Sequence, residues 1–182
     1  TVFFYNDKRF TERSRKIVSM LGPMTVYGMT LALQSENPAA LKAANRRNIT
    51  SSQIDDNIKW AVENNLNATT ELIFGLPGET SESFTNVLDR SVQRGFDSVL
   101  CNNLYLVDGI EMNRPDYIKE HNIGTHFRSV ADNAGIITVK NKENEVHDIF
   151  SAELQRVVTS SKNFNYDEYL GIRLISFFYY AV

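Results

Sequence analysis

The stretch Glu71–Thr80 constrains the fold of this chain more than any other, and it reads Glu-Leu-Ile-Phe-Gly-Leu-Pro-Gly-Glu-Thr. A short apolar run bounded by Gly and Pro is typical of a buried strand. Thr80 is a suitable N-cap for a helix that follows, and Gly95 is a suitable end for it. The apolar residues between them recur at helical spacing: Phe84, Val87, Leu88 and Val92. The sequence therefore predicts a strand, a tight turn and a helix, and α/β proteins place binding sites at such turns.

Strand and helix patterns alternate up to about residue 108. We expect strands at Val2–Tyr5, at Val26–Leu33, in the run that contains Glu71 and at Ser98–Val107, and helices at about Thr11–Leu21, Pro38–Arg46, Ser52–Asn65 and Thr80–Gly95. Repeated strand and helix is the pattern of a parallel sheet with crossover helices. Because a full eightfold barrel needs more residues, the expected fold class is α/β, with four βα units of a partial TIM-type (β/α) barrel.

Local signals at the helix ends support this assignment. Asn37 precedes Pro38, which is the preferred position for proline at the start of a helix. Ser52 with Asp55 resembles a capping box, and Gly22 is a stop signal. These residues predict where three of the helices begin or end.

The alternation fails beyond Asp108. Ile136–Val139 is compatible with a strand, Val146–Val158 is ambiguous, and Tyr166–Phe178 resembles a short amphipathic helix. We therefore expect two regions, the βα units of residues 1–108 and a C-terminal α+β extension of residues 109–182.

Composition excludes several classes of protein. The net charge is −3 and the basic residues are scattered, so the basic footprint of a nucleic-acid-binding protein is missing. No apolar run approaches the length that spans a membrane. A single cysteine, Cys101, rules out an internal disulfide framework, and the absence of a targeting segment makes a cytoplasmic location the expectation.

The residues that suggest chemistry fall in or at the ends of predicted strands. Gln34 and Ser35 end one strand, and Glu71 lies inside the next. In a parallel sheet the carboxyl ends of strands share one edge, which holds the site. Glu71 can accept hydrogen bonds from a pair of sugar hydroxyls, Gln34 can donate and accept, and Arg46 can pair with a carboxylate. Together they suit a zwitterionic nucleoside.

Each of these residues also has a purely structural explanation. Glu71 can be a buried acid satisfied by backbone N–H groups or a cation, Gln34 a turn partner, and Arg46 a partner of the last carbonyls of a helix. A glycosidase pair of Glu71 and Glu79 is disfavoured, because a turn separates the two carboxylates. The three histidines lack zinc-site spacing, so we expect no metal ligands and no catalytic residue in this chain.

Three successive motifs resemble those of radical S-adenosylmethionine (radical SAM) enzymes: Leu31-Ala32-Leu33-Gln34-Ser35, then Leu41-Lys42 with Asn45-Arg46-Arg47-Asn48-Ile49, then Glu71–Thr80. The likeness is strongest to the branch that often carries a cobalamin-binding domain. Three further pieces extend it over most of the chain: Asn6-Asp7-Lys8, Thr125-His126-Phe127-Arg128, and Tyr166-Asp167-Glu168-Tyr169 with Arg173. One departure is Asp108-Gly109-Ile110, which stands where many relatives have Pro-Gly-Thr.

The resemblance implies a cofactor site for S-adenosylmethionine. Gln34 and Glu71 would hold the ribose, Arg46 would pair with the methionine carboxylate, and Ile73 would touch the adenine. Ser35 belongs to the same strand-end motif and is included in the predicted site. Glu71 replaces the Asp of some relatives, so its reach is longer.

The resemblance also implies a 4Fe-4S cluster held by a Cys-x3-Cys-x2-Cys loop, which this chain lacks. We therefore expect a fragment whose cluster loop lies upstream and which is inactive as given. The full-length oxidoreductase would generate a 5′-deoxyadenosyl radical from S-adenosylmethionine, with cobalamin as a further candidate cofactor and an unidentified, small-molecule or other, substrate. The alternative is a noncatalytic barrel module that serves as a scaffold or interaction surface. A truncated barrel is also expected to self-associate through its exposed edges.

Overall fold

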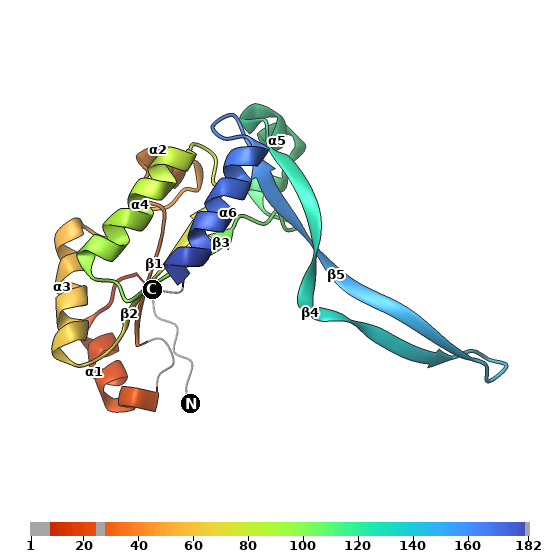
Figure 1. Cartoon of the computed structure of the whole chain (residues 1–182), viewed down its shortest axis with the longest axis horizontal. Coiled ribbons are helices and arrows are strands. Elements are labelled where there is room, and N and C mark those ends of the chain that lie inside the picture. The colour runs from red at the N-terminus through yellow and green to blue at the C-terminus, as the bar shows by residue number, and fades with distance from the viewer. Residues whose placement is uncertain (1–7, 25–27, 181–182) are drawn as a thin grey trace.

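The computed structural model describes residues 8–24 and 28–180, and its core is a three-stranded parallel sheet (Figure 1). The strands are β1 (Met29–Gln34), β2 (Ala68–Phe74) and β3 (Ser98–Asn103), in the order β1-β2-β3. They are connected through α2 (Pro38–Ala43) and α3 (Ser51–Glu63), and then through α4 (Ser81–Arg94). The predicted alternation of strand and helix around Glu71 is therefore confirmed. The predicted strand Val2–Tyr5 lies outside the described residues.

The expected partial TIM-type barrel is wrong. Within the described part of the chain the parallel sheet holds three strands in an open row, and the remaining two strands form a separate antiparallel sheet. Helical and strand periodicity specify parallel strands with crossover helices, but they carry no signal for whether the sheet closes. The fold is an open mixture of α and β elements.

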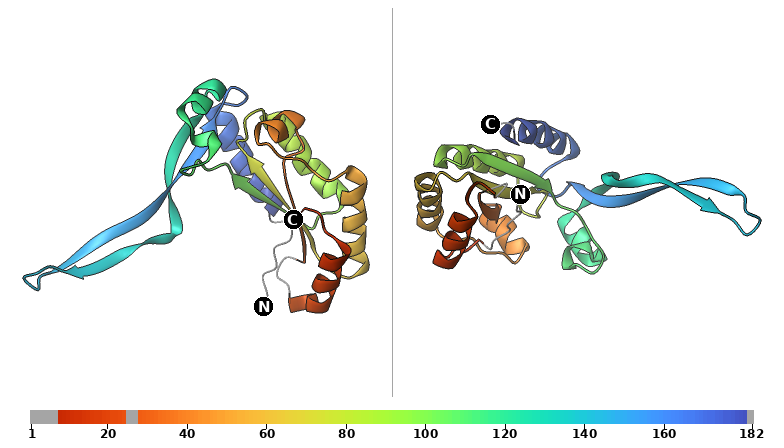
Figure 2. Two further views of the ribbon diagram at one scale, coloured as in Figure 1. Left: turned by 180° about the vertical axis from the view of Figure 1, so that it is seen from behind. Right: turned by 90° about the horizontal axis from the view of Figure 1, so that it is seen from below.

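Among the described residues, the sheet is fully covered on one face only. On this covered face Leu31, Leu72 and Phe74 are at most 1% exposed. The Phe74 ring lies 4.9 Å from Phe84 of α4 and 6.3 Å from Tyr169 of α6 (Tyr166–Tyr180), measured between ring centroids. Burial of each such side chain stabilises the fold by about 1.5–3 kcal/mol. Figure 2 shows α4 and α6 side by side over this face.

Most of the capping signals hold. Asn37 caps α2 through its side-chain oxygen, Thr80 caps α4, and Gly95 ends α4 in the left-handed conformation. The predicted capping box of Ser52 and Asp55 is wrong, because Thr50 and Gln53 form the box of α3 instead. At the N-terminal side, α1 (Glu12–Leu21) ends at Gly22 as expected, followed by a short 3₁₀ helix, η1 (Gly22–Met24).

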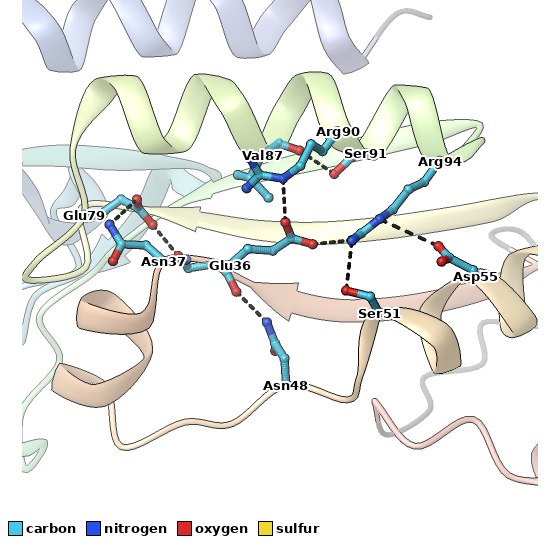
Figure 3. A network of polar contacts seen from close by, with 11 residues as sticks. Glu36, Asn37, Asn48, Ser51, Asp55, Glu79, Val87, Arg90, Ser91 and Arg94 are labelled. Atoms are coloured by element: carbon cyan, nitrogen blue, oxygen red, sulfur yellow. Dashed lines mark hydrogen bonds and ion pairs between the residues drawn. The ribbon is translucent and has the colours of Figure 1, made fainter.

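A polar network ties the end of β1 to α3 and α4 (Figure 3). The Glu36 carboxylate accepts hydrogen bonds from Arg90 Nε at 2.9 Å and from the Arg94 guanidinium. Arg94 in turn lies 3.7 Å from the Asp55 carboxylate and donates to Ser51. These contacts fix the loop that follows β1 against the helix that follows β2.

The C-terminal region is built around a long antiparallel hairpin of β4 (Gly124–Lys140) and β5 (Val146–Ser160). A 3₁₀ turn, η2 (Glu111–Asn113), and α5 (Pro115–His121) precede it, and α6 follows it. The hairpin projects away from the body of the molecule, whereas α6 returns to pack on β3 and α4 (Figure 1). The strand expected at Ile136–Val139 is thus part of a longer one, and Val146–Val158 is a strand.

Candidate functional site

The second face of the parallel sheet is open at its C-terminal half. Residues that pair side by side on parallel strands share a face, and Glu71 pairs with Leu100 while Ile73 pairs with Asn102. These side chains are half-buried or exposed, in contrast to the covered face. We call the surface formed by Glu71, Ile73, Leu100 and Asn102 the open face. Parallel sheets are normally buried on both faces, so the open face is a natural place for a ligand.

A pocket of about 270 Å³ lies at the carboxyl ends of the three strands. It brings together three of the predicted site residues, Gln34, Ile73 and Arg46. Gln34 ends β1, Ile73 lies near the end of β2, and Arg46 follows α2. The remaining wall is apolar or aromatic and consists of Ala43, Ala44, Leu76, Leu104, Ile110, Met112 and Tyr117, with Asn45 and Glu111 as further polar members.

Gln34 has an unusual backbone conformation. Its φ is 67°, and the pairing of β1 with β2 shifts register between Leu31 and Gln34. Left-handed conformations are uncommon for residues other than glycine and cluster at functional sites. Bulges of this kind re-aim a side chain at the end of a strand. In this chain the result is that the Gln34 side chain lines the pocket beside Ile73.

The polar side chains of the predicted site have no protein partner among the described residues. The Arg46 guanidinium is exposed and forms no ion pair there, and the Gln34 amide and the Glu71 carboxylate accept and donate no hydrogen bond there. The nearby cations Arg90 and Arg94, by contrast, are paired with the Glu36 carboxylate. Arg46 and Gln34 are therefore available to a ligand.

Glu71 does not line the same pocket. It lies two residues before Ile73 on the same face of β2, about 6.6 Å lower along the strand, and it lines a neighbouring pocket of about 460 Å³. This second pocket is lined by residues of β2, β3 and α6 and shares no lining residue with the first. The structure therefore brings Gln34, Arg46 and Ile73 together in one pocket. Glu71 lies outside this pocket, two residues before Ile73 on β2.

Ser35 has a structural role in this fold. It is fully buried, and its hydroxyl donates a hydrogen bond to the buried Glu79 carboxylate. Glu79 also accepts from Ser83, at the start of α4, and from Asn37 Nδ2 at 3.4 Å. Glu79 is thus held inside the junction of β1, α2 and α4, away from Glu71, which is consistent with rejecting these two acids as a glycosidase pair.

Sequence reasoning missed the wall of the pocket that comes from residues 110–117. The Tyr117 hydroxyl donates to the Ala43 carbonyl at 3.2 Å and so holds α5 against α2. Burial raises the pKa of this phenol, with smaller contributions from Glu111 and Glu120, so it remains a hydrogen-bond donor at neutral pH. Ile110 and Met112 complete the wall. No local pattern connects residues so far from β1 and β2 in the chain.

Within the described residues, no three His, Cys, Asp or Glu side chains are grouped so that they could hold a metal ion. His126 instead accepts or donates a 2.8 Å hydrogen bond with Thr159 and packs on Tyr166. The described helices also include none that is both long enough and apolar enough to cross a membrane.

Comparisons with known proteins support the fold alone. No protein-family model matches the sequence, and no curated protein matches it. Among solved structures, the chain is similar to TsrM from Kitasatospora setae, a radical S-adenosylmethionine methyltransferase bound to tryptophan and a SAM analogue. The TM-score is 0.57 at 12% sequence identity, and the match covers 96% of this chain but 35% of TsrM. The chain thus spans about a third of that neighbour and shares the fold of that part.

Proposed function

We propose that this chain contributes an S-adenosylmethionine site to a radical SAM enzyme, with the ligand on the open face. The observation that carries this proposal is the pocket in which Gln34, Arg46 and Ile73 meet. Each of these residues was selected from sequence motifs, and the fold places all three in one pocket at the carboxyl edge of the sheet. The similarity to part of a radical SAM methyltransferase supports the same reading.

The chemistry of the pocket suits this ligand. The Arg46 guanidinium, free of protein carboxylates among the described residues, would pair with the methionine carboxylate. The Gln34 side chain and the Glu71 carboxylate, two residues before Ile73 on β2, would accept hydrogen bonds from the ribose hydroxyls. Ile73, Leu76, Leu104 and Met112 offer apolar contacts to a flat adenine ring. In this proposal the residues bind and orient the ligand and exclude water from it.

The described residues do not fit a 4Fe-4S cluster. Such a cluster needs thiolate ligands, and Cys101 is the single cysteine of the chain. We therefore propose no cluster site and no cobalamin site within this chain, and we assign no radical step to its residues. Membership of a larger cluster-containing enzyme is part of the proposal, and S-adenosylmethionine binding by this chain is the part that can be measured directly.

The first test is a calorimetric titration of the chain with S-adenosylmethionine. We expect saturable binding that weakens about 10- to 100-fold in Arg46→Gln, because a hydrogen-bonded charge contributes about 1.5–3 kcal/mol. Gln34→Ala should weaken binding by a smaller factor. The matched control is Arg47→Gln, which removes the adjacent exposed arginine that does not line the pocket. Absence of binding by the wild-type chain, or equal binding by the Arg46 and Arg47 variants, would contradict the proposed site.

We also propose that the chain self-associates through the β4–β5 hairpin, since the described part of the chain forms no barrel whose edges could do so. Ile136 and Phe150 pair on one face of the hairpin and are each 70% exposed. A two-stranded sheet is only marginally stable alone and leaves unpaired edges. In an antiparallel pair of two β5 strands centred on Phe150, His147 of one copy lies opposite Glu153 of the other, and Val146 lies opposite Leu154. These opposed residues are complementary in charge and in apolar character, so β5 can pair with β5 of a second copy.

Sedimentation velocity over a range of concentrations tests this second proposal. We expect a concentration-dependent dimer in the wild-type chain and a monomer in Phe150→Lys, because a charge at the centre of the pair repels its copy. Leu174→Lys is the control, since Leu174 of α6 is 63% exposed but lies outside the hairpin. A wild-type chain that is monomeric at every concentration would exclude the dimer. Dimerisation without S-adenosylmethionine binding would favour a noncatalytic scaffold.

A further inference from the structure

The pocket that contains Glu71 is lined by residues of β2, β3 and α6. The sheet contributes Glu71, Leu100, Cys101 and Asn102, and α6 contributes Arg173, Ser176 and Phe177. Its volume of about 460 Å³ is within the range of small-molecule sites. Opposite charges, Glu71 and Arg173, line the same cavity, and Glu71 lies two residues before Ile73 of the proposed S-adenosylmethionine site.

Arg173 is a positioned cation in this pocket. One of its guanidinium nitrogens donates to the Cys101 carbonyl at 3.2 Å, which fixes the side chain on the β3 edge. No carboxylate of the described residues forms an ion pair with it. The remaining N–H groups of a half-buried guanidinium are suited to a carboxylate from a ligand.

Ser176 supplies a second, independent observation. It lies one turn after Arg173 on α6, is 4% exposed, and its hydroxyl oxygen has no hydrogen bond of standard geometry within the described residues. Its polar neighbour among the described residues is the Cys101 thiol, which is only a weak hydrogen-bonding group, so this buried hydroxyl lacks a strong partner there. An acceptor group of a ligand in this pocket would satisfy it.

Cys101 does not compete for the charge of Arg173. Burial raises the pKa of the Cys101 thiol, and the neighbouring Ser176 hydroxyl and Arg173 offset this only in part. The thiol is therefore protonated at neutral pH, and the positive charge of Arg173 is left to a ligand. Leu100 and Phe177, the latter 67% exposed, line the rest of the pocket with apolar surface.

We propose that this pocket binds an organic acid, with its carboxylate on Arg173 and Ser176 and its apolar part against Leu100 and Phe177, as the substrate of the enzyme. The substrate role rests on the proposed S-adenosylmethionine site beside it. Glu71, which also lines the pocket, would repel a carboxylate placed beside it and so favour the orientation with the acid group on Arg173.

The test uses two matched probes, 3-phenylpropionate and its neutral amide, titrated into the chain and followed by NMR. We expect saturable shifts with the acid and at least tenfold weaker binding of the amide. Arg173→Gln should abolish this preference for the acid. Ser176→Ala is expected to keep the fold, since it removes a hydroxyl with no hydrogen bond of standard geometry among the described residues, and it should weaken acid binding several-fold. Arg47→Gln should change nothing.

Equal binding of the acid and the amide, or binding of neither, would overturn the carboxylate pocket. Unchanged acid binding in Ser176→Ala would remove the role given to its hydroxyl. S-adenosylmethionine is titrated into the same sample, so that the two proposals are separated. If S-adenosylmethionine binds and the acid does not, this inference fails alone. If the acid binds through Arg173 and S-adenosylmethionine does not bind, the substrate role fails.

Discussion

Gly28→Ala is expected to lower the free energy of unfolding by about 3 kcal/mol or more. Gly28 has a φ of 58°, and a Cβ atom there would lie 2.3 Å from the Asn67 carbonyl oxygen. The clashing atom belongs to the backbone and accepts the hydrogen bond of Met29 N–H at 2.8 Å, where β1 meets β2. Relief of the clash therefore requires that β1 and β2 separate at this point, which weakens the hydrogen bond between Met29 N–H and the Asn67 carbonyl.

Gly22→Ala separates the cost of the backbone conformation from the cost of the clash, because Gly22 has a positive φ but no close neighbour. Gly22 has a similar φ of 50°, but nothing lies within 4 Å of a Cβ atom built there. Its replacement should cost about 1–3 kcal/mol, the penalty of a backbone conformation (φ 50°, ψ −133°) that residues with a Cβ atom rarely adopt, without any clash. Urea denaturation of both variants, with unchanged dependence of the free energy on urea concentration, measures the difference. Equal losses would show that the close approach of Gly28 to Asn67 is not present in solution.

Glu79→Ala is the second large effect that we expect, about 3 kcal/mol of lost stability. Glu79 is fully buried and accepts hydrogen bonds from Ser35, Asn37 and Ser83. Its removal leaves the buried Ser35 hydroxyl without its acceptor, and it takes the carboxylate away from Asn37 and Ser83, which keep only the carbonyl acceptors of Gly78 and Thr80. Hydrogen bonds to a charged group contribute about 1.5–3 kcal/mol each and are not additive.

Glu82→Ala is the matched control for Glu79, because Glu82 is an exposed acid in the first turn of the same helix. Its loss should cost less than about 1 kcal/mol, the value of its interaction with the helix dipole. Ser35→Ala combined with Glu79→Ala should cost less than the sum of the single changes, since the two side chains share a hydrogen bond. If Glu79→Ala leaves stability unchanged, Glu79 and Ser35 are not the structural pair described above.

Local signals predicted the part of the fold that local interactions decide. Asn37, Thr80 and Gly95 act within one helical turn of their own positions, and each does what its residue type favours. The capping box of α3 was misplaced because Thr50, Ser52 and their neighbours offer several hydroxyls within one turn. Local competition of this kind is decided by the final packing.

Long-range contacts explain the predictions that failed. Whether three parallel strands close into a barrel depends on partners outside the periodic pattern. The hairpin was underestimated because Ile136 and Ile137 lie on opposite faces and are both exposed, so the strand shows no apolar and polar alternation. Tyr117 lines the pocket because its hydroxyl binds the carbonyl of Ala43, a residue far away in the sequence, and no local pattern predicts such a contact. Gln34 and Arg46 stood out by their chemistry at predicted element ends, whereas Ile73 was marked by the family likeness alone; the three line one pocket, and their binding role remains a prediction.

The most direct test of the S-adenosylmethionine site is the NMR signal of the Ile73 δ1 methyl group during a titration with that ligand. The proposed site predicts a saturable shift of this methyl, caused by the adenine ring above it. The Ile172 methyl, which is in the core at 3% exposure, should stay unchanged. A shift at Ile172 without one at Ile73, or saturable binding that leaves Ile73 unaffected, would show that the open face does not hold the ligand.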